Sequence, residues 1–103
     1  MPQRNSVEAR LKRAMLAGSL TTADLSIWFA RPYATVRGWL QGYEPWGPHG
    51  EESRRLLGVL EQAIQSYRGF PVPVHLSPIE RRKHMKRLRH GLDGRFSQTR
   101  FAQ

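Results

Sequence analysis

The sequence predicts an all-α protein, a small helical bundle followed by a basic C-terminal helix and tail. Two observations support this fold class. Apolar residues recur at helical spacing in several segments, and the residue types that begin or end helices lie at the boundaries of those segments. The length of 103 residues fits one small domain with an appendage, and no segment has the alternation typical of a strand.

Capping residues define the first two elements. The first helix is expected over residues 5–18, where Asn5 as N-cap and Glu8 three residues later form a capping-box pattern. A second helix is expected to begin at about residue 21. Asp24 lies in its first turn, where the helix dipole favours a carboxylate.

A proline separates the second helix from a third. Pro32 disfavours helical geometry in the residue before it but suits the first turn of a new helix. We therefore expect a helix over residues 32–41, with Gly42 at its C-terminal cap. Its apolar residues Val36 and Trp39 are expected to pack against the second helix.

The next segment, YEPWGPHG at residues 43–50, is rich in proline and glycine and is predicted to be a loop. Trp46 within it is expected to fill a gap in the core. A fourth amphipathic helix is predicted over residues 51–67. The segment FPVPVHL, residues 70–76, is predicted to be an extended linker.

A fifth helix has a clear start. Ser77 is a suitable N-cap, Pro78 suits the first helical position, and Glu80 completes a capping box. We expect this helix to run to about His90 and to end at Gly91. In the tail that follows, apolar residues do not recur at a clear helical spacing.

These elements divide the chain into a domain at residues 1–69, a linker at 70–76, and a basic helix and tail at 77–103. Seventeen Lys and Arg against eight Asp and Glu give a formal net charge of +9. A charge of this sign favours a polyanionic partner, because each neutralised phosphate releases condensed counterions. Arginine outnumbers lysine, and its planar fork pairs with phosphate or guanine more specifically.

The segment DLSIWFARPYATVRGWLQG resembles the helix-turn-helix of bacterial and phage repressors. Its YATV is similar to the recognition helix of Lac-repressor-type proteins. VRGWLQGYEP followed by ESRRLLGVLEQAI resembles the phage Cro-type (Xre-like) family, and the likeness covers about residues 20–66. The chain departs from the family pattern at Ala30, where glycine is usual, and at Arg31, where a hydrophobic residue is usual.

The resemblance implies a DNA-binding protein, a sequence-specific transcriptional regulator of phage or mobile-element type, whose third helix enters the major groove of double-stranded DNA. Arg37 has the donors to pair with guanine, Gln41 suits adenine, and Ala34 suits a thymine methyl group. The predicted base-reading residues are Tyr33, Ala34, Arg37 and Gln41. The predicted phosphate contacts are Thr22, Arg31, Thr35, Arg81, Arg82, Lys83, Lys86, Arg87 and Arg89.

Other classes of function find little support. The sequence has no cysteine, no clustered histidines, no phosphate-cradling glycine loop and no catalytic pairing of serine or carboxylates. We therefore expect no catalytic residue, no metal site and no cofactor. No apolar run is long enough to span a bilayer, so no membrane partner is expected. We expect a cytoplasmic protein of a bacterial cell, associated with the nucleoid.

Three alternatives stay open. A phage structural or packaging component, similar to small terminase subunits, would grip DNA without regulating transcription. The basic helix and tail would also suit RNA, and an ordinary helical bundle can carry a surface helix of this kind. The sequence also leaves open whether the protein is a monomer, a homodimer or a higher assembly.

Overall fold

The computed structural model describes residues 6–70, 72 and 75–101, with side chains up to residue 92. This part of the chain is all α-helical and has no strand, as predicted. The elements in order are α1 (Val7–Gly18), α2 (Thr22–Phe29), α3 (Tyr33–Leu40), α4 (Gly47–Tyr67) and α5 (Pro78–Phe101).

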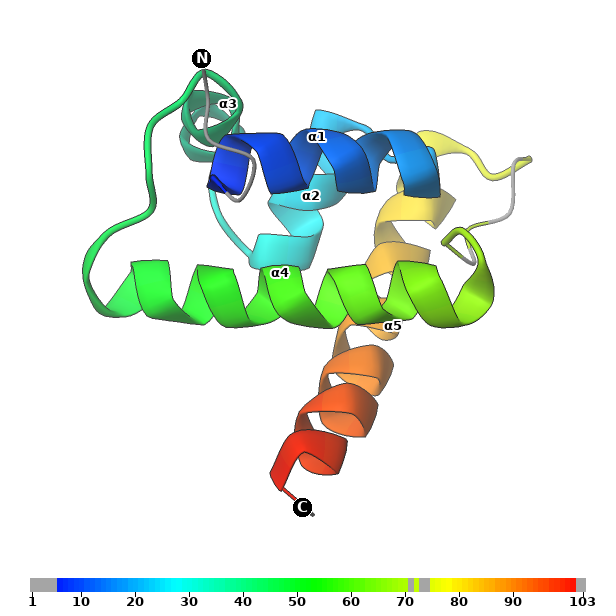
Figure 1. Cartoon of the computed structure of the whole chain (residues 1–103). Coiled ribbons are helices and arrows are strands. Elements are labelled where there is room, and N and C mark those ends of the chain that lie inside the picture. The colour runs from blue at the N-terminus through cyan, green and yellow to red at the C-terminus, as the bar shows by residue number, and fades with distance from the viewer. Residues whose placement is uncertain (1–5, 71, 73–74, 102–103) are drawn as a thin grey trace.

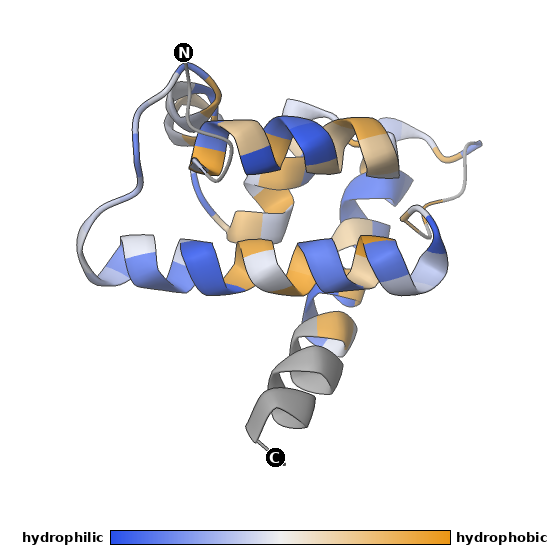
Figure 2. Cartoon of the chain, in the orientation of Figure 1, coloured by the Kyte–Doolittle hydropathy of each residue, from blue (hydrophilic) through white to orange (hydrophobic). Residues whose placement is uncertain are grey.

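Helix α2 lies at the centre of the bundle (Figure 1). Helices α1 and α4 lie on either side of it, α3 packs beside α1 and α2, and α5 crosses behind α4 and extends beyond it. The residues of α2 are largely hydrophobic (Figure 2), as expected for a helix enclosed by its neighbours. The radius of gyration, 13.2 Å, is that of one domain of this length.

One apolar core joins all five helices. Trp28 is fully buried, its indole Nε1–H donates to the carbonyl of Leu56 at 2.9 Å, and Phe70 meets its ring edge-on. The indole donor therefore has a partner, as a buried polar group requires. The buried apolar residues are Val7, Leu11, Ala14, Leu20, Leu25, Trp28, Phe29, Val36, Trp39, Leu56, Leu57, Val59, Leu60, Ala63, Met85 and Leu92.

The predicted helices are present, but several of their ends differ. Helix α3, predicted over 32–41, spans Tyr33–Leu40 and has Gln41, not Gly42, as its C-cap. Helix α1 begins at Val7, because the hydroxyl of Ser6 caps it by accepting from the Ala9 N–H at 3.1 Å; the predicted cap, Asn5, lies outside the described residues. Helix α4 begins inside the segment predicted as a loop, because a proline in the first turn of a helix is tolerated. Helix α5 continues through Gly91, because one glycine costs a helix only about 1 kcal/mol.

The expectation that Trp46 fills the core is wrong. Its side chain is 86% exposed. The buried residues of this segment are its neighbour Pro45 and Gly50 in the first turn of α4, which pack against each other. A sequence rule that buries tryptophan by type alone therefore chooses Trp46 in place of Pro45.

Helix α5 is docked on the bundle along a narrow apolar seam. Met85 is fully buried and Leu92 is 5% exposed, while the exposed Ile79 stays in water. The helix packs against α2 and α4. The basic segment therefore shares the core of the preceding residues.

Candidate nucleic-acid interface

The unit formed by α2 and α3 begins with a full capping box. The hydroxyl of Thr21 accepts from the Asp24 N–H at 3.1 Å, and the Asp24 carboxylate accepts from the Thr21 N–H at 2.9 Å. Two N–H groups that the helix leaves without partners are thereby satisfied. Thr22, a predicted phosphate contact, is the first residue of α2 and is half-buried.

The turn between the helices is strained at Ala30 and is held by two hydrogen bonds between Ser26 and Arg31. Ala30 adopts the left-handed conformation, with φ 54° and ψ 46°, at the position where the resembled family has glycine. The Ser26 hydroxyl donates to the Arg31 carbonyl at 2.7 Å, and the Arg31 N–H donates to the Ser26 carbonyl at 3.1 Å. Ser26 therefore ties both sides of the turn, which offsets the unfavourable conformation of Ala30.

The inner face of α3 is fixed in the core. Val36 is fully buried and Trp39 is 6% exposed. The rings of Phe29 and Trp39 meet edge-to-face with centroids 5.4 Å apart, a favourable aromatic geometry. The predicted packing of the second and third helices is confirmed, and it prevents α3 from rotating about its axis.

The outer face of α3 carries the residues predicted to read bases. All of Tyr33, Ala34, Arg37 and Gln41 are exposed, and so is the predicted phosphate contact Thr35. Among the described residues, none forms an ion pair with Arg37. The structure thus gathers these side chains on one accessible surface, with the guanidinium of Arg37 available to an outside acceptor.

Arg31 lies at the edge of this surface. It is half-buried, and its guanidinium contacts Nδ1 of His49 in the first turn of α4. Because an arginine has five N–H donors, one such contact leaves others for a phosphate.

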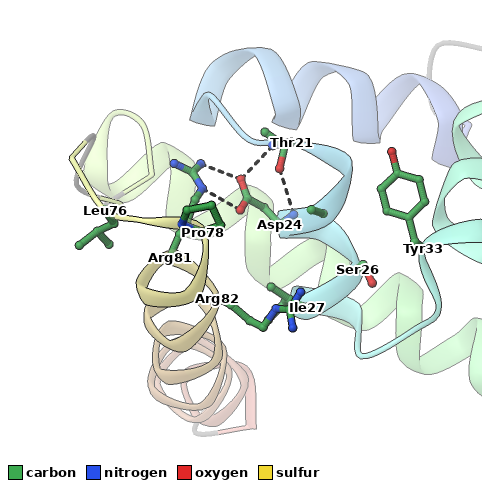
Figure 3. A pocket seen from close by; sticks show the side chains of 10 residues that line it. Thr21, Asp24, Ser26, Ile27, Tyr33, Leu76, Pro78, Arg81 and Arg82 are labelled. Atoms are coloured by element: carbon green, nitrogen blue, oxygen red, sulfur yellow. Dashed lines mark hydrogen bonds and ion pairs between the residues drawn. The ribbon is translucent and has the colours of Figure 1, made fainter.

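A buried ion pair joins α5 to the start of α2. The Asp24 side chain is 3% exposed, and the Arg81 guanidinium donates to its two oxygens at 2.8 and 2.6 Å (Figure 3). Burial acts to raise the pKa of Asp24, but the hydrogen bonds from Arg81 and Thr21 outweigh it and hold that pKa below its ordinary value. Arg81 is thus committed to the fold, so we leave it out of the phosphate contacts that we propose.

The other predicted phosphate contacts of α5 differ in their exposure. Arg82, Lys83, Lys86 and Arg87 are exposed. Arg82 and Tyr33 line the same hollow over α2, so this side chain of α5 is on the side that faces α3 (Figure 3). Arg89 is half-buried, and its Nε–H has no acceptor among the described residues.

Acidic side chains in the bundle are balanced locally. Glu61 accepts two hydrogen bonds from Arg10, Glu8 pairs with Lys12, and Glu44 pairs with Arg54. With Asp24 held by Arg81 and Glu52 paired with Arg55, five of the eight acidic side chains of the chain are paired within the fold. The excess positive charge is left to exposed basic residues, which attract a polyanion.

Two features of this region were not predicted from the sequence. The pairing of Asp24 with Arg81 joins residues far apart in the chain, and no local pattern indicates it. The exposed position of Trp46 beside α3 was also missed. Its neighbours Pro45 and Gly47 signalled only a loop.

Metal and membrane features are not found in the described part of the chain. No three of its His, Asp or Glu side chains group as they would to hold a metal ion. None of its helices combines the length and the apolar character needed to cross a bilayer.

Comparison with known proteins finds no relative: no family model, curated protein or solved structure matches the chain. The class that the fold defines is a small all-α, five-helix bundle. Its function has to be inferred from the residues themselves.

Proposed function

We propose that this protein binds double-stranded DNA and reads its sequence with α3, acting as a transcriptional regulator of phage or mobile-element type. One observation carries the proposal. Val36 and Trp39 fix one side of α3 in the core, while Arg37 and Gln41 stand exposed on the other. An α-helix fits the major groove, where each base pair presents a distinct pattern of donors and acceptors.

The charge distribution supports the same proposal. The chain carries a net charge of +9, and the acidic groups near α3 are paired within the bundle. Arg82 lies on the α3 side of α5, and Lys83, Lys86 and Arg87 continue along that helix. In this proposal, the basic residues of α5 supply backbone contacts that position the protein, and α3 supplies the contacts that specify sequence.

The test is selection of bound oligonucleotides from a random duplex pool by the full chain. We expect recovery of a short motif in which guanine and adenine positions are strongly constrained, as contacts from Arg37 and Gln41 require. A palindromic motif would indicate a homodimer.

Binding without any enriched motif would contradict the proposal and favour the packaging component that grips DNA regardless of sequence. Preference for RNA over duplex DNA of the same sequence would contradict it in favour of RNA binding. Failure to bind either DNA or RNA at low salt would exclude every nucleic-acid-binding function considered for this protein.

A further inference from the structure

Trp46 differs from the other two tryptophans of the chain because it is left in water. Its side chain is 86% exposed, whereas those of Trp28 and Trp39 are 0% and 6% exposed. Tyr43, 72% exposed, lines the same hollow as Trp46. Two exposed aromatic rings lining one hollow form an apolar surface of the kind that marks an interaction site.

The backbone presents Trp46 in a fixed way. Trp46 is the N-cap of α4 in an extended conformation, with φ −135° and ψ 163°. Pro45 before it is buried, and a Cβ built on Gly50 would lie only 2.7 Å from the Pro45 carbonyl carbon. The first turn of α4 is therefore packed closely against Pro45, so little backbone order has to be gained when Trp46 meets a partner.

Trp46 lies between two hollows that border α3. The first hollow is shared with Ala34 and Thr35 of α3 and with Gln41 at its C-cap, and the second with Arg31 and Thr35. The indole is thus continuous with the surface that contains two of the proposed base-reading residues. A strand bordering a groove entered by α3 would pass within reach of it.

Charge decides which occupant fits this surface. Arg31 supplies a guanidinium in the second hollow. Glu44 lines the first hollow, but its carboxylate accepts from the Val7 N–H and pairs with Arg54, both at 3.4 Å. The surface thus combines two exposed aromatic rings with one guanidinium, that of Arg31, and this combination fits a sugar–phosphate strand.

We infer that Trp46 is a contact to the DNA backbone. Its indole face packs on a deoxyribose of the strand that borders the groove entered by α3, and its Nε1–H donates to a phosphate oxygen. Among the described residues that N–H has no acceptor, whereas the Nε1–H of Trp28 donates to Leu56. This inference rests on the proposed function and adds an uncharged contact to it.

Intrinsic fluorescence tests the inference directly, because only one of the three tryptophans is exposed. Acrylamide, a neutral quencher, should reach mainly Trp46 in the free protein. Addition of the selected duplex should reduce that quenching, and high salt should restore it by releasing the DNA. Trp46→Phe should show little quenching with or without DNA, which assigns the signal.

Binding by variants provides the second measurement. Trp46→Ala should weaken duplex binding on the order of tenfold, as truncation of an aromatic anchor does. The slope of log affinity against log salt should stay unchanged, because no charge is removed. Leu16→Ala is the matched control: Leu16 is also 86% exposed but lies in the last turn of α1, the end away from α3 (Figure 1).

Each outcome decides the inference. If acrylamide reaches Trp46 equally in free and bound protein and Trp46→Ala binds as the parent does, the inference fails while the proposed function stands. If the parent binds no duplex, both fail. Protection of Trp46 by a proline-rich peptide or by self-association, with none from DNA, assigns the surface to a protein partner and overturns the inference.

Discussion

Helix α3 presents one basic side chain, Arg37, and α5 presents several, and the bundle holds the two helices in different ways. Helix α3 is short, and Val36 and Trp39 on its inner face fix its rotation. Helix α5 is long and highly charged, and it is held through Met85 and the pair of Arg81 with Asp24. Tight packing holds a few hydrogen-bond donors at defined positions. A long charged helix attracts a polyanion without needing its side chains at defined positions. Under the proposed function, this difference assigns specificity to α3 and affinity to α5.

The largest expected effect is loss of the packing beneath α3. Trp39→Ala removes a side chain that is 6% exposed and in edge-to-face contact with Phe29. The cavity should cost about 3–5 kcal/mol, a large part of the stability of a domain this small. Urea denaturation followed by circular dichroism measures it. A variant that unfolds like the parent but binds DNA less well would show that Trp39 is a contact and not a support.

Removal of the exposed charges of α5 should weaken binding without changing sequence preference. The variant replaces Arg82, Lys83, Lys86 and Arg87, all exposed, with glutamine. The slope of log affinity against log salt should become less negative, by about 0.9 for each lost phosphate contact. A salt titration beside analytical ultracentrifugation checks this. An unchanged slope with altered sedimentation would identify α5 as an assembly element.

Loss of Arg81 should affect folding more than DNA affinity, unlike loss of its neighbours. Arg81→Ala leaves the buried Asp24 carboxylate unpaired and should cost about 2 kcal/mol, less than for a fully buried pair because 26% of the Arg81 side chain is exposed. Lys86→Ala, an exposed site on the same helix, is the control and should unfold like the parent.

The same pair predicts a pH dependence. Because the pKa of Asp24 is held below its ordinary value in the fold, the stabilisation by the pair is complete above about pH 4 and is lost as the pH falls through the lower folded pKa. Urea unfolding of the parent and of Arg81→Ala between pH 2 and pH 7 measures this. Equal acid sensitivity in both proteins would show that Asp24 does not depend on Arg81.

The smallest effect is relief of strain in the turn. Ala30→Gly should stabilise the protein by about 1 kcal/mol, because Ala30 has φ 54° and glycine adopts this conformation freely. Ala23→Gly, at an exposed helical position of α2, should destabilise it by a similar amount. Thermal unfolding compares the two, and a loss of stability in both would show that Ala30 is not strained.

Local patterns were sufficient to predict most of the fold. Asp24 in the first turn indicated the start of α2. The break at Pro32 and the apolar spacing of Val36 and Trp39 indicated α3 and its exposed face. These features depend on residues a few positions apart, where sequence and geometry are directly linked.

Features that depend on distant residues could not be predicted in this way. The partner of Arg81 is Asp24 on α2. From the sequence alone, Arg81 was predicted to be one more phosphate contact. The exposure of Trp46 follows from close packing between Pro45 and Gly50, which only the folded backbone reveals. The start of α4 was missed because proline and glycine signal both loops and the first turns of helices.

The most direct test of the comparison is motif selection by two variants that each lose one exposed arginine. Arg37→Ala removes the exposed arginine of α3, and Arg87→Ala removes one exposed arginine of α5. We expect Arg37→Ala to relax one position of the selected motif, at a cost of roughly 1–3 kcal/mol in discrimination. Arg87→Ala should select the parent motif with uniformly lower affinity. Identical motifs of equal stringency from the parent and Arg37→Ala would contradict the assignment of sequence reading to α3.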